Sequence, residues 1–328
     1  MELITPSVEI WEQDNSLNGI WEHIARCTRV CYQSTSNIKK GETTEEFVKR
    51  VILRIDKLKD ETTEEYLKRV DKLLSKGELN WDKLHGAMLE HGTVYLKLDK
   101  KDNAENLWYT HYLNNKYSKV IHSQETDCFY ITTNLRVIYE NDWLNSLKYI
   151  CAPTKYHPKR VTVSFTTNIG VSREFNRHRV NSIAEESTRY CNYNKRNDGQ
   201  IKIGLPAWLL DEDNIEYVDR HSTDELHSYC TDIADGDDIK WCDIDYYLFA
   251  LTCAEYCYNN LIAKGWKPQQ AREVLPLATK SQLIHTAFVD DWKHFFALRA
   301  DGVSGPVHPN AKLLAMPLKQ EFIKRQLI

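Results

Sequence analysis

A dense polar stretch at residues 173–190 is the feature that most constrains this chain. It reads REFNRHRVNSIAEESTRY and contains four arginines, one histidine, three carboxylates and two serines. Little of it is apolar, so core packing does not explain it. Arginine guanidinium groups beside small hydroxyls suit a planar anion such as a nucleotide phosphate. On composition alone, a solvated and charged helix face remains the alternative.

The composition is that of a globular protein. Its 328 residues permit one large domain or two ordinary ones, and 42% of them are hydrophobic. The net charge of −4 gives no general positive field for a nucleic-acid duplex, so any anion site must be local. The start lacks the layout of a signal peptide, and no apolar run approaches the roughly 20 residues that span a bilayer. We therefore expect a cytoplasmic protein without membrane contact.

The cysteines indicate little about function. There are nine of them, without Cys-x-x-Cys spacing. This pattern predicts reduced thiols in or near the core and no metal site.

Hydrophobic spacing predicts a chain of short strands and helices. Helices are expected at 17–32, 246–264 and 292–299, with further helices opening at Pro268 and His308. Strands are expected at 8–11, 93–98, 129–138, 161–165 and 282–289. Residues 166–170 are expected to form a bend and 141–150 a helix.

Two segments have the character of inserts. TTEEFVKRV at 43–51 recurs as TTEEYLKRV at 62–70, and each copy opens with a Thr-x-x-Glu capping box. We expect a solvent-facing pair of helices within 35–80. Residues 196–245 are acidic, with runs at 211–213 and 235–238, and we expect a peripheral excursion there.

The polar stretch also matches a known pattern. Arg177-His-Arg-x-x-Ser182-x-x-Glu185-x-Ser187-x-Arg189-Tyr190 resembles the signature of the flavin-dependent thymidylate synthases, the ThyX family. One departure is Ala184, where the family often has Asn or Gln. Further segments resemble family motifs in the same order: His85–His91, Ala271–Pro276, Trp292–Arg299 and His308–Asn310.

The resemblance implies an α+β fold in which helices pack on a mixed β-sheet. It implies a single catalytic domain over residues 1–328, with inserts at 35–80, 99–160 and 196–245. Members of the family are homotetramers whose active sites are shared between subunits, so we expect the same here.

The implied reaction converts dUMP to dTMP. Methylenetetrahydrofolate donates the carbon, FAD reduced by NADPH supplies the hydride, and no enzyme cysteine attacks the substrate. Arg299 is the implied catalytic residue, because it would hold negative charge that develops on the uracil ring. The implied dUMP-binding residues are Glu174, Arg177, Glu185, Glu186, Ser187, Thr188, Arg189, Arg272 and Arg299. The implied FAD-binding residues are His91, Thr93, Arg177, His178, Arg179, Glu185 and His294.

Several alternatives stay open at this point. His91 is equally explained as a buried structural histidine, and His294 as a core histidine beside Phe295 and Phe296. Cys191 follows the motif but has no recognisable nucleophile context, so we expect it to be dispensable. A related enzyme that modifies dUMP differently, for example by hydroxymethylation, would share these motifs. A nucleic-acid-binding module that uses the polar stretch as a basic patch is the more distant alternative.

Overall fold

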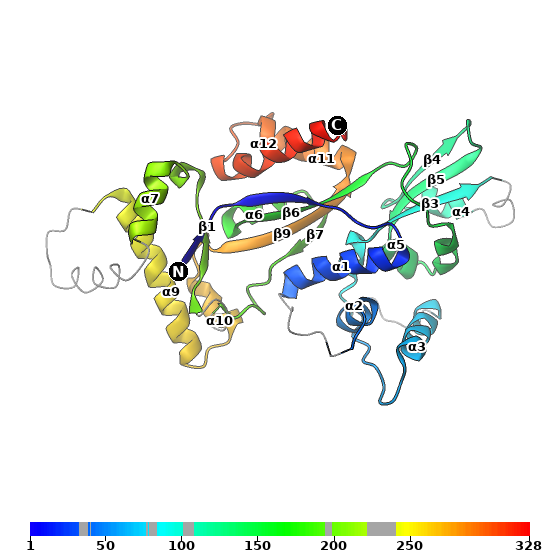
Figure 1. Ribbon diagram of the computed structural model, residues 1–328, viewed down its shortest axis with the longest axis horizontal. Helices are drawn as coiled ribbons and strands as arrows, with labels where there is room; N and C mark the ends of the chain where they lie inside the picture. Colours follow the sequence, from blue (N-terminus) through cyan, green and yellow to red (C-terminus); the bar gives the residue numbers. More distant parts are fainter. Residues whose placement is uncertain are drawn as a thin grey trace.

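The computed structural model describes residues 1–32, 39, 41–76, 78, 84–100, 108–193, 199–221 and 241–328. An antiparallel sheet of four strands lies at its centre, in the order β2-β6-β9-β7 (Figure 1). The strands are β2 (Ser7–Trp11), β6 (Arg160–Asn168), β7 (Ser182–Glu185) and β9 (Lys280–Phe288).

Helices cover both faces of this sheet. Helix α1 (Leu17–Tyr32) lies on one side, and α11 (Val289–Phe296) and α12 (Pro309–Lys324) lie on the other (Figure 1). The sequence of β9 explains the two layers, because neighbouring side chains of a strand point to opposite faces. Leu283 joins the apolar cluster of α11 and α12, and Ile284 joins the cluster of α1.

The layer with α11 and α12 is built largely from aromatic rings. Phe165 of β6 packs edge-on against Phe175, with 5.0 Å between ring centroids. Trp292 is fully buried and donates a hydrogen bond from Nε1 to the carbonyl of Val161 at 3.1 Å. This bond satisfies the one polar atom of the indole and fixes α11 against the sheet.

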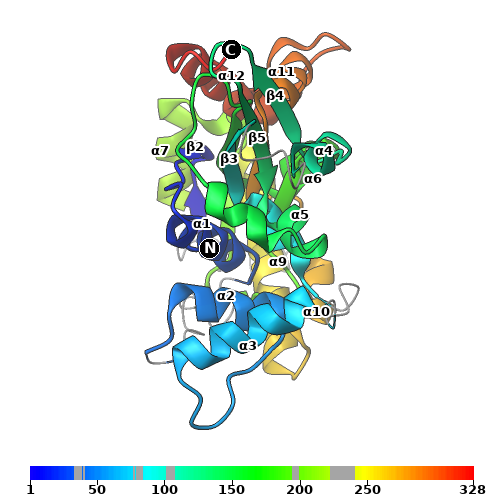
Figure 2. The same ribbon diagram turned by 90° about the vertical axis from the view of Figure 1, so that its right-hand side faces the viewer.

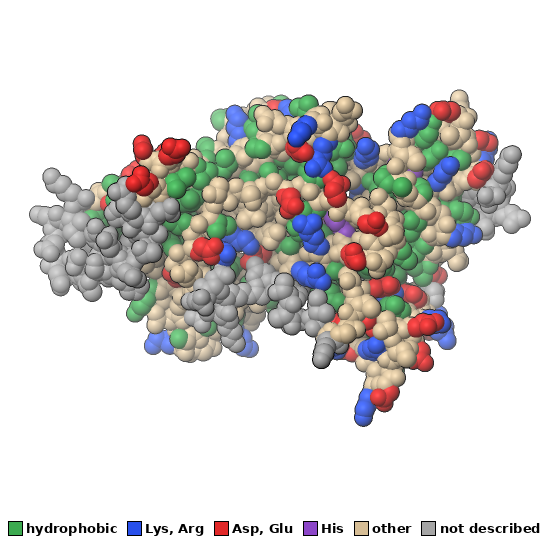
Figure 3. Space-filling model, viewed as in Figure 1, with side chains coloured by type: hydrophobic (Ala, Val, Ile, Leu, Met, Phe, Trp, Pro, Cys, Tyr) green, Lys and Arg blue, Asp and Glu red, His purple; other side chains and the backbone are tan. Residues whose placement is uncertain are grey.

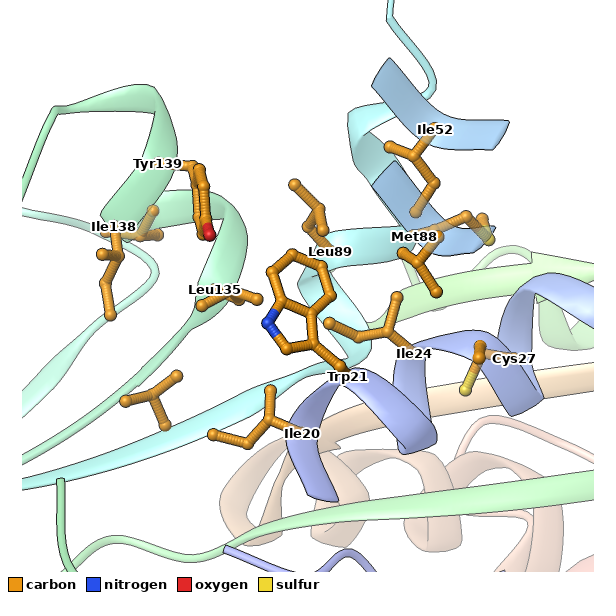
Figure 4. Packing of buried hydrophobic residues seen from close by; sticks show 14 of the residues in the cluster. Ile20, Trp21, Ile24, Cys27, Ile52, Met88, Leu89, Leu135, Ile138 and Tyr139 are labelled. Atoms are coloured by element: carbon orange, nitrogen blue, oxygen red, sulfur yellow. The ribbon is translucent and has the colours of Figure 1, made fainter. Parts of the chain in front are cut away.

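The layer with α1 centres on Trp21. Its ring meets Tyr139 edge-on at 5.9 Å, and Ile20, Ile24 and Leu89 surround it (Figure 4). These residues come from α1, from the 3₁₀ helix η2 (Gly86–His91) and from α5 (Leu135–Glu140). The cluster therefore joins the N-terminal helix to the segments around residues 90 and 135.

Two smaller sheets flank the central one. Strands β3 (Thr93–Asp99), β5 (Cys128–Asn134) and β4 (Lys119–Ser123) form an antiparallel sheet at the right of Figure 1. Strand β1 (Glu2–Ile4) pairs in parallel with β8 (Lys202–Gly204). The α+β class is thus confirmed. The expected mixed sheet is instead two antiparallel sheets, with parallel pairing confined to β1 and β8 in the described chain.

Residues 35–80 contain the two predicted helices, α2 (Thr44–Leu53) and α3 (Thr63–Ser75), which lie side by side in Figure 2. Both capping boxes are formed, at Thr43 and at Thr62. The expectation of a solvent-facing pair is wrong for both helices, because Phe47 and Ile52 of α2 and Tyr66 and Val70 of α3 are buried in the apolar cluster that includes α1. The amphipathic sequences place these apolar residues on one face of each helix.

Two predicted boundaries differ from the structure for the same reason. The expected bend at 166–170 is wrong, because β6 continues to Asn168 and α6 (Ile169–Phe175) begins at the next residue. Likewise, the strand expected at 129–138 ends at Asn134, where α5 begins. In each case the asparagine Oδ1 accepts a hydrogen bond from the backbone N–H three residues on, at Val171 and Val137. An asparagine can end a strand and cap a helix at once.

The remaining described elements complete the chain. They are α4 (Trp108–Leu113), η3 (Leu144–Tyr149), η6 (Ala207–Leu209), α7 (Glu212–His221), α9 (Asp243–Ala263), α10 (Pro268–Ala271), η7 (Arg272–Val274) and the π-helical turn η8 (Ala297–Asp301). The η3 turn stands where a helix was expected at 141–150. The region 196–245 contributes β8 and α7, while its acidic run at 235–238 lies outside the described residues. None of the described helices combines the length and apolarity required to cross a membrane.

Candidate active site

Arg299 lies in the π-helical turn η8, directly after α11. Such turns occur frequently at functional sites because they reorient a side chain within a helix. Its Nη1 donates to Oε2 of Glu174 at 2.8 Å, and its Nη2 donates to the Glu174 carbonyl at 2.8 Å. Glu174 comes from the end of α6, so this pair of bonds joins η8 to the start of the polar stretch.

His178 completes the support of Arg299. Its Nε2 accepts a hydrogen bond from Arg299 Nε at 3.2 Å. Burial, and then the charge of Arg299 and the neighbouring His294, lower the pKa of His178 to about 4. A neutral imidazole is what this bond requires, because a protonated ring has no acceptor nitrogen.

A cavity of about 650 Å³ opens beside this group. It lies between the end of α6, the start of the polar stretch, α11 with η8, and the segment 304–308. Six residues predicted from the sequence line it together: Glu174, Arg177, His178, Arg179, His294 and Arg299.

The cations at the edge of this cavity are available to a ligand. Arg177 and Arg179 are exposed, and no described carboxylate lies within ion-pair distance of either guanidinium. His294 is exposed too, with its ring 5.9 Å from that of His178. The alternative of a core histidine at position 294 is therefore wrong. The helix turns its apolar neighbours Phe295 and Phe296 inward instead.

A second cavity, of about 520 Å³, gathers the other part of the predicted set. Here Arg272 Nη1 donates to Thr188 Oγ1 at 3.2 Å, and Ser187 Oγ accepts from the Arg189 backbone N–H at 3.3 Å. The predicted residues that line it are Glu185, Glu186, Ser187, Thr188, Arg189 and Arg272.

The two glutamates of the second cavity are held by the protein. Glu185 accepts hydrogen bonds from Ser172, Ser281 and Asn176, at 2.5, 2.8 and 2.7 Å. Glu186 is buried and forms an ion pair with Lys280 at 2.5 Å. Each carboxylate thus has a fixed position, and a ligand would meet Glu185 in a fully hydrogen-bonded state.

The two cavities share no lining residue within one chain. The residues predicted for dUMP are divided between them, with Glu174, Arg177 and Arg299 in the first cavity and the remainder in the second. A single copy therefore does not bring the whole predicted set around one ligand.

His91 and Thr93 line neither of these two cavities. His91 is fully buried, and its Nδ1 is 2.8 Å from the hydroxyl of Thr286. Burial lowers the pKa of His91 well below its ordinary value. This environment is that of a structural histidine. Thr93 borders a separate cavity of about 220 Å³.

Sequence reasoning missed Arg160, the first residue of β6. Its Nη1 donates to the Glu90 carbonyl at 3.1 Å and to Thr93 Oγ1 at 3.3 Å, and its Nη2 donates to Ser182 Oγ at 3.2 Å. One guanidinium thus ties η2 and β3 to the polar stretch. The local sequence gives no signal for this role, since Lys159-Arg160 before an apolar run looks like an ordinary strand start.

Ala184, the departure from the family pattern, lies away from the ligand cavities. It is 1% exposed and belongs to the apolar cluster of α1, opposite Ile284 in the β7–β9 register. The substitution therefore changes core packing at the back of the polar stretch.

The cysteine nearest to the motif, Cys191, lies outside both cavities. It is fully buried in an apolar cluster with Tyr193 and Tyr258. Among the described residues, no group of three His, Cys, Asp or Glu side chains has the arrangement to hold a metal ion. Cationic and acidic side chains are interspersed on the face shown in Figure 3, which differs from the one-sign surface that a duplex binder presents.

Residues 157–308 match the model of the family described as thymidylate synthase complementing protein. No curated protein sequence matches the chain. A solved structure of the UMP/dUMP methylase PolB from Streptomyces cacaoi, bound with 5-Br dUMP, shares 17% identity with a TM-score of 0.37, over 100% of this chain and 93% of that one. Those values are too low to transfer anything from PolB. The family match spans the polar stretch, Arg272 and Arg299, so the segment 157–308 is similar to the thymidylate synthase complementing protein family.

Proposed function

We propose that this protein is a flavin-dependent thymidylate synthase, which converts dUMP to dTMP with methylenetetrahydrofolate and NADPH. The observation that carries the proposal is the arrangement of Arg299 between Glu174 and His178, beside a cavity edged by two arginines that have no ion-pair partner among the described residues. All of these residues lie within the matched segment 157–308.

The first cavity fits a flavin dinucleotide by its donor set. Arg177 and Arg179 offer uncompensated guanidinium groups to a diphosphate, and His178 and His294 present ring faces beside them. A volume of about 650 Å³ lies within the range of cofactor sites. When bound, FAD reduced by NADPH supplies the hydride that turns the transferred methylene group into a methyl group.

In this proposal, Arg299 stabilises the negative charge that develops on the uracil ring. Carbon 5 of uracil becomes a better nucleophile when negative charge on the N3–O4 side of the ring is stabilised. A guanidinium already held by Glu174 and His178 offers that stabilisation without reorganising during the reaction. Burial lowers the pKa of Arg299, while Glu174 opposes the shift and keeps the side chain cationic.

The second cavity would bind the dUMP phosphate. Arg272 and Arg189 supply charge there, and the hydroxyls of Ser187 and Thr188 supply further hydrogen-bonding groups. Because Arg299 lines a different cavity of the same chain, we propose that a second copy brings its phosphate cavity to the first. The homotetramer expected from the resemblance would supply such shared sites.

The whole of residues 1–328 would then form one catalytic domain. The helical pair α2–α3 packs against α1, and the β3–β5–β4 sheet joins the same apolar cluster. Both inserts thus share a core with the matched segment, as expected of parts of one domain.

The test is the identity of the nucleotide product. Purified protein is incubated with dUMP, methylenetetrahydrofolate and NADPH, and the nucleotide is identified by mass. We expect dTMP together with a flavin absorbance spectrum. Hydroxymethyl-dUMP would replace the proposal by the hydroxymethylase alternative, and a colourless protein without either product would refute both.

A further inference from the structure

Glu185 lines the second cavity without a cationic partner. Its side chain is half-buried, and no described lysine or arginine lies within ion-pair distance of its carboxylate. The donors that hold it are all neutral, namely the hydroxyls of Ser172 and Ser281 and the side-chain amide of Asn176. The protein therefore fixes this carboxylate in the cavity wall without neutralising it.

The three donors divide between the two oxygens of Glu185. Ser172 Oγ and Ser281 Oγ donate to Oε1 at 2.5 and 2.8 Å, and Asn176 Nδ2 donates to Oε2 at 2.7 Å. Two of the donors come from α6 and its C-terminal end, and the third comes from β9. Because each oxygen is held separately, the plane of the carboxylate is fixed, and Oε2 depends on Asn176 alone among the described residues.

The sequence of α6 explains how one short helix serves both cavities. Ser172 and Asn176 are four residues apart, so their side chains lie on the same helical face, and the Asn176 backbone N–H donates to the Ser172 carbonyl at 2.9 Å. Glu174 lies between them in the sequence and holds Arg299 in the first cavity instead. The end of α6 thus positions a carboxylate for one cavity and an arginine for the other.

The amide of Asn176 is costly to the fold. Its Oδ1 is buried and accepts no hydrogen bond from any described residue. A buried acceptor without a donor destabilises a protein, and an apolar side chain at this position would avoid that cost. Such a side chain would also leave Oε2 of Glu185 without its donor. The amide is therefore better explained by Glu185 than by the stability of α6.

We propose that Asn176, supported by Ser172 and Ser281, is a positioning residue that orients Glu185 to accept a hydrogen bond from dUMP. This inference rests on the proposed function and extends it to three residues outside the cavity linings. At neutral pH dUMP has two donors, the ring N3–H and the sugar 3′-hydroxyl. Either can share Oε2 with Asn176, since a carboxylate oxygen has two lone pairs.

The experiment is a titration of the full-length protein with dUMP, which gives Kd without turnover. Asn176→Asp keeps the shape of the side chain but replaces the donor by an acceptor and places a second negative charge beside Glu185. We expect the Kd of dUMP to rise by about 10- to 100-fold, because a hydrogen bond to a charged group is lost. Ser172→Ala is the second variant if Asn176→Asp does not fold. It should raise Kd by about 3- to 10-fold, because Ser281 still holds Oε1.

A double variant separates positioning from a general structural role. If Asn176 acts through Glu185, then Asn176→Asp should add no further loss of dUMP affinity once Glu185→Gln is present. A structural role for Asn176 would instead multiply the two single effects. That product, or a wild-type Kd in Asn176→Asp, would overturn the proposal.

Asn260→Asp is the matched control. It makes the same exchange in α9, where Asn260 Nδ2 donates to the Tyr256 carbonyl at 2.9 Å, and position 260 lines neither cavity. We expect its Kd for dUMP to equal that of the wild type.

The same proteins distinguish this inference from the proposed function. Coupled variants in a protein that binds dUMP but forms no dTMP would support the positioning role and refute the proposed reaction. Uncoupled variants in a protein that forms dTMP would do the reverse. A wild type that does not bind dUMP would overturn both.

Discussion

Arg299 is held from two elements at once, by Glu174 of α6 and by His178 at the start of the loop that follows. Three hydrogen bonds fix the plane of its guanidinium, so little rotational freedom is left to lose when a ligand arrives. The side chain combines a fixed orientation, partial burial and a retained positive charge. These are the properties that electrostatic stabilisation of a transition state requires.

Replacing Arg299 by Ala should lower kcat by about 10²- to 10³-fold, because one preorganised donor is lost. The flavin spectrum should persist, since Arg177 and Arg179 remain. The measurement is the rate of dTMP formation alongside bound flavin. Lys293→Ala, which removes an exposed cation from the preceding helix α11, is the control and should retain activity. Full activity in Arg299→Ala would exclude the catalytic role.

Stability should fall between pH 7 and pH 5, because buried histidines resist protonation. The folded-state pKa values of His23 and His178 are lowered to about 4, and that of His285 to about 3, chiefly by burial. Below the ordinary value of 6.5, the unfolded chain takes up protons that the folded chain refuses. Each of these groups therefore removes up to about 1.4 kcal/mol of stability per pH unit in that window.

Urea unfolding at several pH values measures this slope. His23→Gln, which removes one of the three groups, should make the slope shallower. A free energy of unfolding that stays constant from pH 7 to pH 5 would contradict the assignment of neutral buried histidines.

For individual residues, the sequence predicted which charged and polar side chains form the cavities better than it predicted which cavity each of them lines. Four of the six predicted residues of the first cavity, Glu174, Arg177, His178 and Arg179, lie close together because they are close in the sequence, whereas His294 and Arg299 come from the separate segment 292–299. The sequence did not separate Glu185–Arg189 from Arg299, since which cavity a side chain faces depends on the β7–β9 pairing. The sequence did not predict that Arg160 links separate elements, because its hydrogen-bond partners Glu90 and Ser182 are distant in the chain.

Among the elements, those with local signals were predicted well. Helix α1 spans residues 17–32 as expected, because its apolar period is regular and long. The strand pair β1–β8 was not anticipated, since residues 2–4 pair with residues 202–204 and no local pattern encodes that contact. Helix α6 was missed because it is short and its polar residues obscure the helical period.

The capping box of α3 gives a prediction at this scale. Thr62→Ala removes a side chain that accepts from the Glu65 backbone, so the free energy of unfolding should fall by about 1 kcal/mol. Turnover should be unchanged, because α3 lines neither proposed ligand cavity. Chemical denaturation measures the first quantity and dTMP formation the second.

Glu64→Gln is the control, since it changes an exposed side chain in the same turn of α3 and leaves the cap in place. Its effect should stay within a few tenths of a kcal/mol, as is usual at surface positions. Equal destabilisation by the two variants would show that the cap is not the source of the effect.

At the scale of the whole molecule, the division of predicted residues between two cavities requires an assembly. If Arg272 of one copy and Arg299 of another serve the same ligand, two inactive variants should complement each other. Arg272→Ala and Arg299→Ala, unfolded and refolded together, should regain activity at about one quarter of the sites, by random pairing. Each variant refolded alone is the control. A mixture as inactive as its components would place both arginines of each site on one chain.

A single-turnover experiment tests directly whether this protein uses a bound flavin to methylate dUMP. Protein with its flavin reduced by NADPH is freed of excess NADPH and mixed without oxygen with dUMP and methylenetetrahydrofolate. Flavin absorbance and nucleotide mass are then followed together. Flavin absorbance should return at the rate at which dTMP appears, with one dTMP formed per flavin. Formation of dTMP without a change in the flavin, or return of the absorbance without dTMP, would contradict it.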